Sequence, residues 1–364
     1  EITVRDWSSD VCSSDLSWPE LEAAVISGGH PPFRARQLWQ WLWRRGARNF
    51  ADMTSLARDF REELGRAWNI AWPEPLDIRR SADGTVKLLL GLADGASVET
   101  VLIPDRDRYT QCLSCQVGCP MGCTFCSTGL MGLTRNMTGG EIAAQVLAGR
   151  DYLRTSGLGW EVKNLVYMGM GEPLLNWEGV RKSLDILTHS EGLEFSRRRV
   201  TLSTCGIPDR LDVFGTEGLA LPAISLHAPT QEIRETLMPK AARWHLDDLV
   251  AALAKISLRP RERLTIEYIL IKGVNDSLLH ARQLVRLLSR LKCKINLITF
   301  NPGPGIPYEA PDPEDVLAFE ALLRRKNFTV TLRRSKGQDI AAACGQLKTE
   351  TLTSIRKGNA DGTA

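Results

Sequence analysis

Five of the nine cysteines of this chain lie within fifteen residues, from Cys112 to Cys126. Three of them, Cys119, Cys123 and Cys126, follow the spacing C-x3-C-x2-C. Cysteine thiolates hold iron–sulfur clusters in proteins, and a cubane cluster contains four irons. Three closely spaced cysteines can bind three of these irons and leave the fourth open to a substrate. This arrangement is what an enzyme needs to chelate S-adenosylmethionine (SAM) through its amino and carboxylate groups and to reduce it.

The same cysteines have two other interpretations. Cys112 and Cys115 could combine with Cys123 and Cys126 as a four-thiolate zinc site, or all could be buried structural thiols. Only seven residues separate the two pairs, which is short for a zinc knuckle, and Cys119 would be left over. The spacing therefore favours an iron–sulfur cluster.

Several motifs together resemble one enzyme family. The run from Gln116 to Gly129, Q-V-G-C-P-M-G-C-T-F-C-S-T-G, is similar to the cluster loop of the radical-SAM enzymes that methylate adenine in RNA, the RlmN/Cfr family. The resemblance continues through Gly169-Met-Gly-Glu-Pro, Ser225-Leu-His, Phe300-Asn-Pro and Ala343-Cys-Gly-Gln-Leu. Because it spans roughly residues 30–350, it does not depend on a single motif. It implies two cofactors, a 4Fe-4S cluster and SAM.

The resemblance also implies which residues bind SAM, and most of them stand at or just after predicted strands. They are Gly171, Glu172, Ser203, Ser225, Leu226, His227 and Asn301. Glycine lets a backbone approach a ligand without a Cβ in the way, and Glu172 can accept hydrogen bonds from an ammonium group. Each polar residue could instead be a satisfied cap at the rim of a barrel.

The family reaction gives roles to two further cysteines and one glutamate. The electron-poor adenine carbons C2 and C8 cannot attack the methyl group of SAM directly, so a radical route is needed. The resemblance implies that Cys344 is methylated by one SAM and that a radical from a second SAM activates this methyl group for addition to adenine. Glu99 would remove the ring proton. Cys112 would attack the Cys344 sulfur, form a transient disulfide and release methyladenine. A buried structural thiol is the alternative for either cysteine.

The family also implies substrate and partners. We expect methylation at C2 of adenine in 23S rRNA and tRNA, with electrons from a donor such as flavodoxin. Methylation at C8, as in the Cfr type, stays open, as does a zinc-stabilised RNA-binding protein without catalysis. A radical-SAM enzyme with another substrate, such as an activating enzyme, is disfavoured because simple hydrogen abstraction needs no methyl-carrying thiol like Cys344.

Composition agrees with a soluble globular protein. The chain has 364 residues, of which 43% are hydrophobic and 24% charged, enough for a large domain with a smaller appendage. The net charge of +3 does not by itself indicate a nucleic-acid partner. No apolar run is long enough to span a bilayer, and no secretory segment is evident. We expect a cytoplasmic monomer with reduced thiols.

Five sequence regions are predicted. Residues 1–16 are polar and repetitive, and we expect them to be disordered or non-native. Residues 17–72 form a helical accessory domain, 73–108 a β extension, 109–348 the barrel with its catalytic C-terminal segment, and 349–364 a tail.

The helical accessory domain is predicted to bind RNA. Between Pro31 and Phe50 there are five arginines and no acidic residue, interleaved with Trp39, Trp41 and Trp43. Basic and stacking side chains together suit structured RNA. The alternative is a helical bundle with a solvated basic face and its tryptophans in the core.

Two hairpins are predicted in the β extension, with turns at Asp83-Gly84 and Asp94-Gly95. On the last strand, Glu99 shares a face with Val101 and Ile103 by two-residue alternation. A carboxylate on an apolar face resists ionisation and can serve as a general base near neutral pH. Taken without the family resemblance, the residues favour a strand-edge glutamate that reaches solvent.

From Tyr109 onward strands and helices alternate, which predicts a parallel sheet that closes toward a barrel. The predicted strands are Tyr109–Ser114, Asn164–Met168, Arg199–Ser203, Leu221–His227, Leu264–Ile271, Lys294–Phe300 and Thr329–Arg333. Helical segments include one that begins with the capping box Thr138-Gly-Gly-Glu141 and one over Leu278–Leu291. A full eight-fold barrel is the alternative, but six core strands and one C-terminal strand favour the partial (β/α)6 radical-SAM barrel that the resemblance implies. The chemistry of such barrels sits at the C-terminal ends of the strands.

Overall fold

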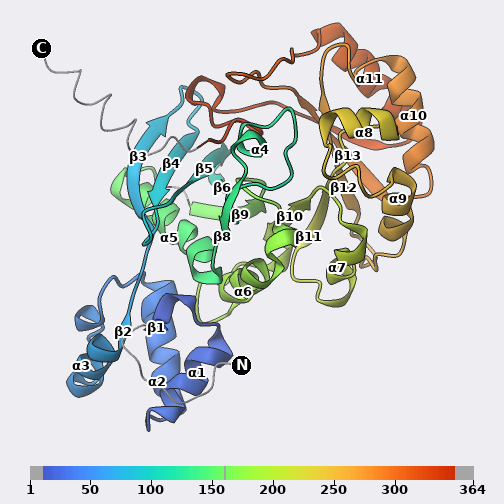
Figure 1. The fold of residues 1–364 in the computed structure, drawn as a ribbon. Helices are drawn as coiled ribbons and strands as arrows, with labels where there is room; N and C mark the ends of the chain where they lie inside the picture. Colours follow the sequence, from blue (N-terminus) through green and yellow to red (C-terminus); the bar gives the residue numbers. More distant parts are fainter. Residues whose placement is uncertain (1–10, 160, 349–364) are drawn as a thin grey trace, which may run out of the picture.

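A computed structural model describes residues 11–159 and 161–348 of the chain. Figure 1 shows a small N-terminal helical domain beside a larger α/β domain, and an irregular segment, residues 70–73, leads from the first into the large sheet. Among the described residues, no helix has the length and apolar character needed to cross a membrane.

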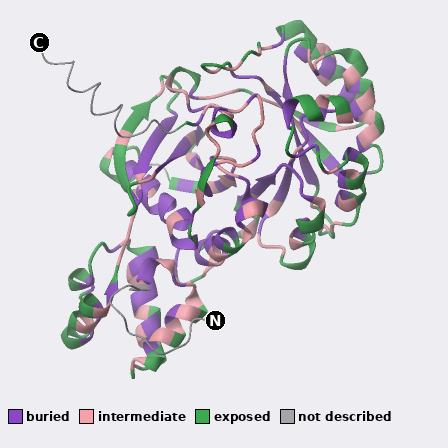
Figure 2. Ribbon diagram, viewed as in Figure 1, coloured by how far each residue is buried: buried purple, intermediate pink, exposed green. Residues whose placement is uncertain are grey.

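The N-terminal domain is built on buried tryptophans. Its helices are α1 (Trp18–Ser27), α2 (Pro32–Trp39), which continues as a π-helical turn (Gln40–Arg44), and α3 (Arg58–Ala67). Trp39 and Trp43 are fully buried, with ring centroids 6.0 Å apart. Figure 2 shows buried residues, in purple, along the helices of this domain. The prediction that Trp39 and Trp43 stack on RNA was wrong for these two residues, because their helical spacing turns both side chains toward the core. Trp41 is partly exposed, below the guanidinium of Arg45 at 4.1 Å.

The expected disorder of residues 1–16 was wrong for residues 11–16. Strand β1 (Val11–Cys12) pairs in parallel with β2 (Trp68–Asn69), and a 3₁₀ turn follows at Ser13–Asp15. The Ser13 hydroxyl donates to the Asn69 carbonyl at 2.9 Å, and Asp15 accepts from the Gly140 amide at 3.0 Å. Polar residues that suggested a solvated segment instead satisfy backbone groups of neighbouring elements. The rest of that prediction, residues 1–10, and the predicted tail, 349–364, lie outside the described residues.

One ten-stranded sheet organises the larger domain, in the order β14-β13-β12-β11-β10-β9-β6-β5-β4-β3. Its strands are β3 (Glu74–Arg80), β4 (Val86–Gly91), β5 (Ser97–Asp105), β6 (Arg108–Cys112), β9 (Glu161–Tyr167), β10 (Val200–Thr204), β11 (Leu221–Ser225), β12 (Leu264–Leu270), β13 (Cys293–Thr299) and β14 (Thr329–Arg333). All neighbours from β6 to β14 are parallel, and those from β3 to β6 are antiparallel.

The seven strands predicted for the barrel are therefore all present. The β extension is part of the same sheet rather than a separate hairpin unit, since β5 pairs with β6 as well as with β4. The predicted strand Leu221–His227 ends at Ser225, because the amides of Leu226 and His227 both turn to the Glu267 carbonyl and His227 adopts a left-handed conformation, with φ 55°.

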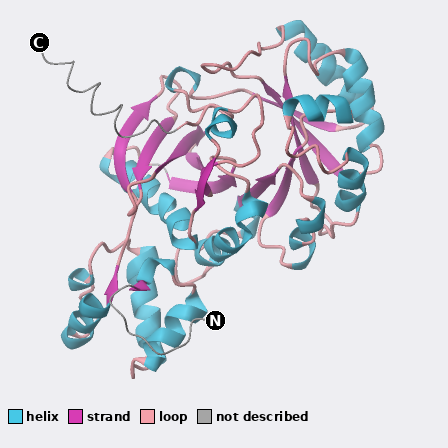
Figure 3. Ribbon diagram, in the orientation of Figure 1, coloured by secondary structure: helices cyan, strands magenta, loops and turns pink. Residues whose placement is uncertain are grey.

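Helices line the outside of the parallel strands, as Figures 1 and 3 show. The helices of the larger domain that follow the cysteine loop are α5 (Gly139–Thr155), α6 (Trp177–Thr188), α7 (Val213–Thr216), α8 (Gln231–Leu237), α9 (Leu246–Ala254), α10 (Leu278–Leu288) and α11 (Pro313–Arg325). The short helix α4 (Ser127–Met131) lies instead within the cysteine loop. The predicted capping box opens α5: Thr138 accepts from the Glu141 amide at 3.2 Å, and Glu141 accepts from the Thr138 amide at 2.9 Å. A short hairpin, β7 (Gln116–Gly118) with β8 (Leu133–Asn136), holds the cysteine-rich loop between its strands.

Candidate active site

The three spaced cysteines lie around one cavity at the C-terminal ends of the parallel strands. The cavity is also lined by side chains or backbone from six other predicted site residues: Gly171, Glu172, Ser203, Ser225, His227 and Cys344. Leu226, Asn301, Cys112 and Glu99 are not among its lining residues. Residues spread over more than two hundred positions thus meet at one end of the sheet.

The cysteine loop is shaped by its hydrogen bonds and by one close approach. Cys119 donates its amide to the Gly132 carbonyl at 2.8 Å, and a Cβ on Gly118, which has φ +80°, would lie only 2.0 Å from that oxygen. The amide of Ser127, just after the last cysteine, donates to Gly345 at 2.7 Å. This bond joins the cysteine loop to the segment that carries Cys344.

The donor set fits an iron–sulfur cluster. Burial raises the pKa of the Cys119 thiol to about 12, and it also raises the pKa values of Cys123 and Cys126. Positive charge at the centre of the loop, such as a cluster supplies, would offset that penalty on the thiolates. A cubane presents a separate iron to each cysteine, so its ligands surround a volume. Among the described residues, no three His, Cys, Asp or Glu side chains form a group that could hold a single metal ion.

The four-thiolate zinc site is not supported by the fold. The charged and polar neighbours of the Cys112 thiol are Cys344, Arg333 and the Met168 amide, whereas Cys123 and Cys126 neighbour Cys119. Cys112 thus belongs to a different part of the site from the cluster cysteines. All nine cysteines are free thiols in this structure.

Glu172 is a buried carboxylate, 4% exposed, surrounded by protein donors. It accepts from the Thr204 hydroxyl at 2.6 Å, the Cys205 amide at 2.8 Å and the Leu174 amide at 3.1 Å. Burial raises the pKa of this carboxyl, and these hydrogen bonds oppose the rise. Each carboxylate oxygen has two lone pairs, so Glu172 retains capacity to accept from a ligand ammonium group.

Gly171, beside Glu172, is required for a reason other than the approach of a ligand that we expected. A Cβ on Gly171 would lie 2.7 Å from the side chain of Gln116 and 2.8 Å from the Cys115 sulfur. Its φ is +108°, a conformation that side chains rarely adopt. Packing against the cysteine loop, as well as any approach of a ligand, therefore requires glycine here.

The next two strand ends place short polar groups close together. The hydroxyls of Ser203 and Ser225 are 3.2 Å apart. His227 accepts from the Ile269 amide through Nδ1 at 3.1 Å, and burial followed by the Arg234 charge lowers its pKa to about 3. The imidazole is therefore neutral at physiological pH, with its proton on Nε2.

Two of the predicted SAM contacts are engaged with the protein. Leu226 is fully buried in the core. Its amide donates to the Glu267 carbonyl and its carbonyl accepts from Arg234, so its backbone groups already have partners. Its side chain can offer only apolar contact. Asn301 is also buried, accepts from Gln338 at 2.6 Å and donates to the Cys344 carbonyl at 3.4 Å. Asn301 thereby holds the segment that carries Cys344.

Glu99 is buried, in contrast to the solvent-exposed strand edge that the residues alone favoured. It is 4% exposed, on a strand between β4 and β6, and its carboxylate is covered by Lys87 and by the backbone at Lys348. Its Oε1 lies 2.9 Å from Lys87 Nζ, and its Oε2 accepts from the Lys348 amide at 2.9 Å. Burial raises the pKa of Glu99, and the Lys87 charge works against this rise.

Three charged residues near the site were missed from sequence: Lys87, Glu267 and Arg333. Glu267 is 2% exposed and lines the cavity, and its Oε2 has no hydrogen-bond partner within the described residues. Arg333 ends the last strand, β14, near both Cys112 and Cys344. A charged residue inside an otherwise apolar strand could have indicated two of them from the sequence: Lys87 lies in V-K-L-L-L and Glu267 in L-T-I-E-Y-I-L.

The comparisons with known proteins cover nearly the whole chain. The Radical SAM superfamily matches residues 113–285, and the ribosomal RNA large subunit methyltransferase N-terminal domain matches residues 14–70. The chain is similar to the "Dual-specificity RNA methyltransferase RlmN" of Solidesulfovibrio magneticus, with 56% identity over 92% of this chain and 96% of the relative. The protein of that name from Desulfotalea psychrophila is 45% identical, over 97% of this chain and 98% of the relative.

A solved structure is similar as well. The crystal structure of a radical SAM methyltransferase from Sphaerobacter thermophilus superposes with a TM-score of 0.88 at 42% identity, over 93% of this chain and all of that chain. This likeness confirms the predicted fold class, a partial radical-SAM barrel with an N-terminal helical domain.

Replacing Cys119, Cys123 or Cys126 with alanine should abolish the broad visible absorption of the reconstituted protein and its cleavage of SAM, because each would supply one cluster ligand. Iron and sulfide content and the visible spectrum measure this. Cys293→Ala is the matched control: this thiol is also buried but begins β13, at the end of the strand away from the cavity, and the variant should keep both properties. Full iron content in Cys123→Ala would contradict the assignment.

Proposed function

The chain belongs to the RlmN family of dual-specificity RNA methyltransferases, and on this premise we propose that it methylates C2 of adenine in 23S rRNA and tRNA by radical-SAM chemistry. The observation that carries the proposal is the neighbourhood of two free cysteines, Cys112 and Cys344, beside the cavity of the three-cysteine loop. Simple hydrogen abstraction needs no such pair. C2 is proposed over C8 because the relatives that span the whole chain carry the name RlmN.

The cofactor-binding residues follow from the shared cavity. Cys119, Cys123 and Cys126 would hold a 4Fe-4S cluster, and the strand-end set that includes Glu172 and His227 would bind SAM. When bound, the two groups supply a methyl group and a carbon-centred radical. The buried Glu172 would orient the amino group of SAM, and the neutral His227 can donate only from Nε2.

Cys344 and Cys112 would act in sequence. Cys344 lines the cavity, where it can receive the methyl group. Burial raises the pKa of Cys112 to about 12, so this group is a thiol until a late step draws its proton away. Its thiolate would then attack the Cys344 sulfur: the new S–S bond forms as the bond from that sulfur to the methyl-derived carbon breaks, and this carbon keeps the electron pair and takes up a proton to become the methyl group. Glu99 would accept the ring proton of adenine.

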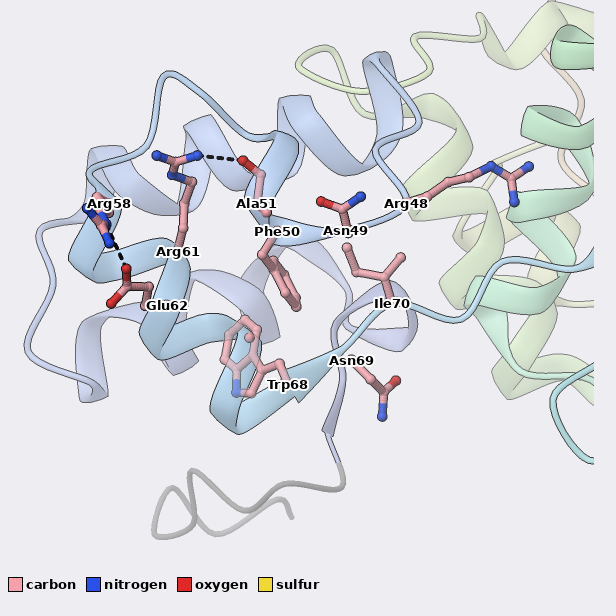
Figure 4. A pocket seen from close by; sticks show the side chains of 11 residues that line it. Arg48, Asn49, Phe50, Ala51, Arg58, Arg61, Glu62, Trp68, Asn69 and Ile70 are labelled. Atoms are coloured by element: carbon pink, nitrogen blue, oxygen red, sulfur yellow. Dashed lines mark hydrogen bonds and ion pairs between the residues drawn. The ribbon is translucent and has the colours of Figure 1, made fainter.

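The N-terminal domain would contact the RNA. A hollow of about 550 Å³ on this domain is lined by Arg48, Arg58, Arg61, Phe50 and Trp68, among others. Figure 4 shows these side chains. The arginines of this domain differ in whether they already pair with acidic residues of the larger domain.

Three arginines of this domain already have partners on the larger domain. Arg36 pairs with Glu191 at 3.8 Å and Arg44 with Glu194 at 3.5 Å, and Arg48 pairs with Glu74 and with Asp151. They would set the orientation of the domain. Arg45, exposed above Trp41, and Arg58, whose side chain is 82% exposed, are better placed for phosphates.

The remaining partners are proposed on general chemistry. Reduction of the cluster requires an electron donor such as flavodoxin. Nine free thiols suit a reducing compartment such as the cytoplasm. We propose a monomer, since one chain contains every residue that the reaction requires.

The Arg45→Gln/Arg58→Gln double variant should bind RNA with a weaker salt dependence, because each lost phosphate contact lowers the slope of log Kd against log salt by roughly 0.7–0.9. Filter binding over a range of salt concentrations measures the slope. Arg290→Gln, an exposed arginine just after α10, is the control and should leave the slope unchanged. If the double variant keeps the slope of the original protein, phosphate binding by these two arginines is excluded.

Cys112→Ala and Cys344→Ala should fail at different points. Without Cys344 there is no methyl-carrying sulfur, so no bond to RNA can form. Without Cys112 the protein should be methylated and add to adenine but stay attached to RNA. A denaturing gel with and without ribonuclease should show a ribonuclease-sensitive upshift in Cys112→Ala only, absent in Cys344→Ala and in the double variant. Identical behaviour of the two single variants, with neither attached to RNA, would refute the proposed division of labour.

A further inference from the structure

A lysine and a glutamate are buried together on two neighbouring strands near the antiparallel edge of the large sheet. The side chains of Lys87, on β4, and Glu99, on β5, are each 6% exposed, and their charged atoms are 2.9 Å apart. In the antiparallel register, Lys87 lies opposite Val101, two residues from Glu99, so the pair is a diagonal one on one face of the sheet.

Both members of this pair also bind the segment that carries Cys344. Lys87 Nζ donates to the Ala341 carbonyl at 3.0 Å, three residues before the cysteine. Glu99 Oε2 accepts from the Lys348 amide at 2.9 Å, four residues after it. The ion pair thus fastens the segment on both sides of Cys344.

Stability alone does not explain such a pair. Taking two charges out of water costs several kcal/mol per ion, and apolar side chains of similar volume would be at least as stable in many cases. The pair instead joins the two parts of the proposed reaction that must meet at one adenine, the proton acceptor and the methyl-carrying cysteine.

We propose that Lys87 is a positioning residue that keeps Glu99 ionised and aimed at the adenine, and that holds the Cys344 segment against it. This inference rests on the proposed methylation of adenine. Lys87 occupies Oε1 of Glu99, whereas Oε2 is held only by a backbone amide of the C-terminal segment. Oε2 is therefore the oxygen that would accept the ring proton. The C–H bond breaks, an O–H bond forms and the electron pair stays in the ring, while the one electron left over from radical addition would pass to a one-electron acceptor, which the iron–sulfur cluster would supply when bound.

The charge of Lys87 has a defined consequence for pH. The charged groups that face Glu99 are Lys87 from β4 and, more weakly, Arg79 from β3, which also pairs with Asp77. Glu99 must be ionised to accept a proton, so the rate falls as pH drops through its pKa. Burial raises this pKa and Lys87 lowers it. Without the lysine charge the pKa rises, and the acid limb of the rate profile moves to higher pH.

The test is a single-turnover pH profile for release of methylated RNA from the covalent adduct. In Lys87→Met the acid limb should move up by about 1–3 pH units, which is the effect of one close opposite charge on a carboxyl. At pH values below the new limb, ribonuclease-sensitive adduct should accumulate. Lys87→Arg, which keeps the charge, should retain the original limb. Lys163→Met is the matched control, a lysine paired with Glu161 at the start of β9, and should match the original profile.

Lys87→Met leaves Glu99 without a buried partner, which can prevent folding. Lys87→Gln removes the charge but can still donate to the Ala341 carbonyl, and it should show the same shift. The proposal would be overturned if Lys87→Met or Lys87→Gln folds and the acid limb of its pH profile coincides with that of the original protein. Mass spectrometry of nucleosides from RNA treated with the original protein separates the two hypotheses. If the original protein forms no methyladenosine, the proposed function fails. If it forms methyladenosine and the acid limb of the neutral variants does not move, only the role of Lys87 fails.

Discussion

The segment from Ala341 to Lys348 is the constraint on which the rest of the site depends. It crosses the open end of the sheet without forming a helix or strand, so its backbone groups need partners from elsewhere in the chain. Those partners are Lys87 on β4, Glu99 on β5, Ser127 and Thr128 beside the cysteine loop, and Asn301 after β13. The hydrogen bonds that satisfy the backbone of this segment therefore place the proposed base, the cluster loop and the SAM-binding residues around Cys344.

The antiparallel strands have a functional consequence that a parallel barrel alone would not provide. Because β3, β4 and β5 extend the sheet beyond β6, Glu99 lies on an interior strand and is shielded from water. The same burial makes an unpaired carboxylate costly, which the Lys87 charge offsets. The N-terminal domain is fastened near this edge by Arg48, which reaches Glu74 at the start of β3. The proposed RNA-binding domain and the proposed base thus share one structural support.

Local patterns predicted much of this fold, and long-range contacts account for what they missed. Alternation of strands and helices predicted all seven barrel strands, and T-x-x-E predicted the start of α5, because these signals depend only on neighbouring residues. The local sequence Val98-Glu-Thr-Val could not predict the burial of Glu99, because the groups that cover its carboxylate, Lys87 and the amide of Lys348, are not its neighbours in the sequence. The order at residues 11–16 depends on Asn69 and Gly140, far along the chain. The cysteine spacing predicted the cluster loop, but the roles of Lys87, Glu267 and Arg333 become visible only when the sheet places Glu267 in the cavity, Lys87 beside Glu99 and Arg333 near Cys344.

The most direct test of the account is mass spectrometry of nucleosides from RNA treated with the purified, reconstituted protein. Unmodified 23S rRNA and tRNA would be incubated with the protein, SAM and a reductant, then digested to nucleosides. The account predicts 2-methyladenosine in both RNAs, with no product when SAM is omitted. Formation of 8-methyladenosine instead, or no methylated adenosine from a protein that carries its cluster and cleaves SAM, would contradict it.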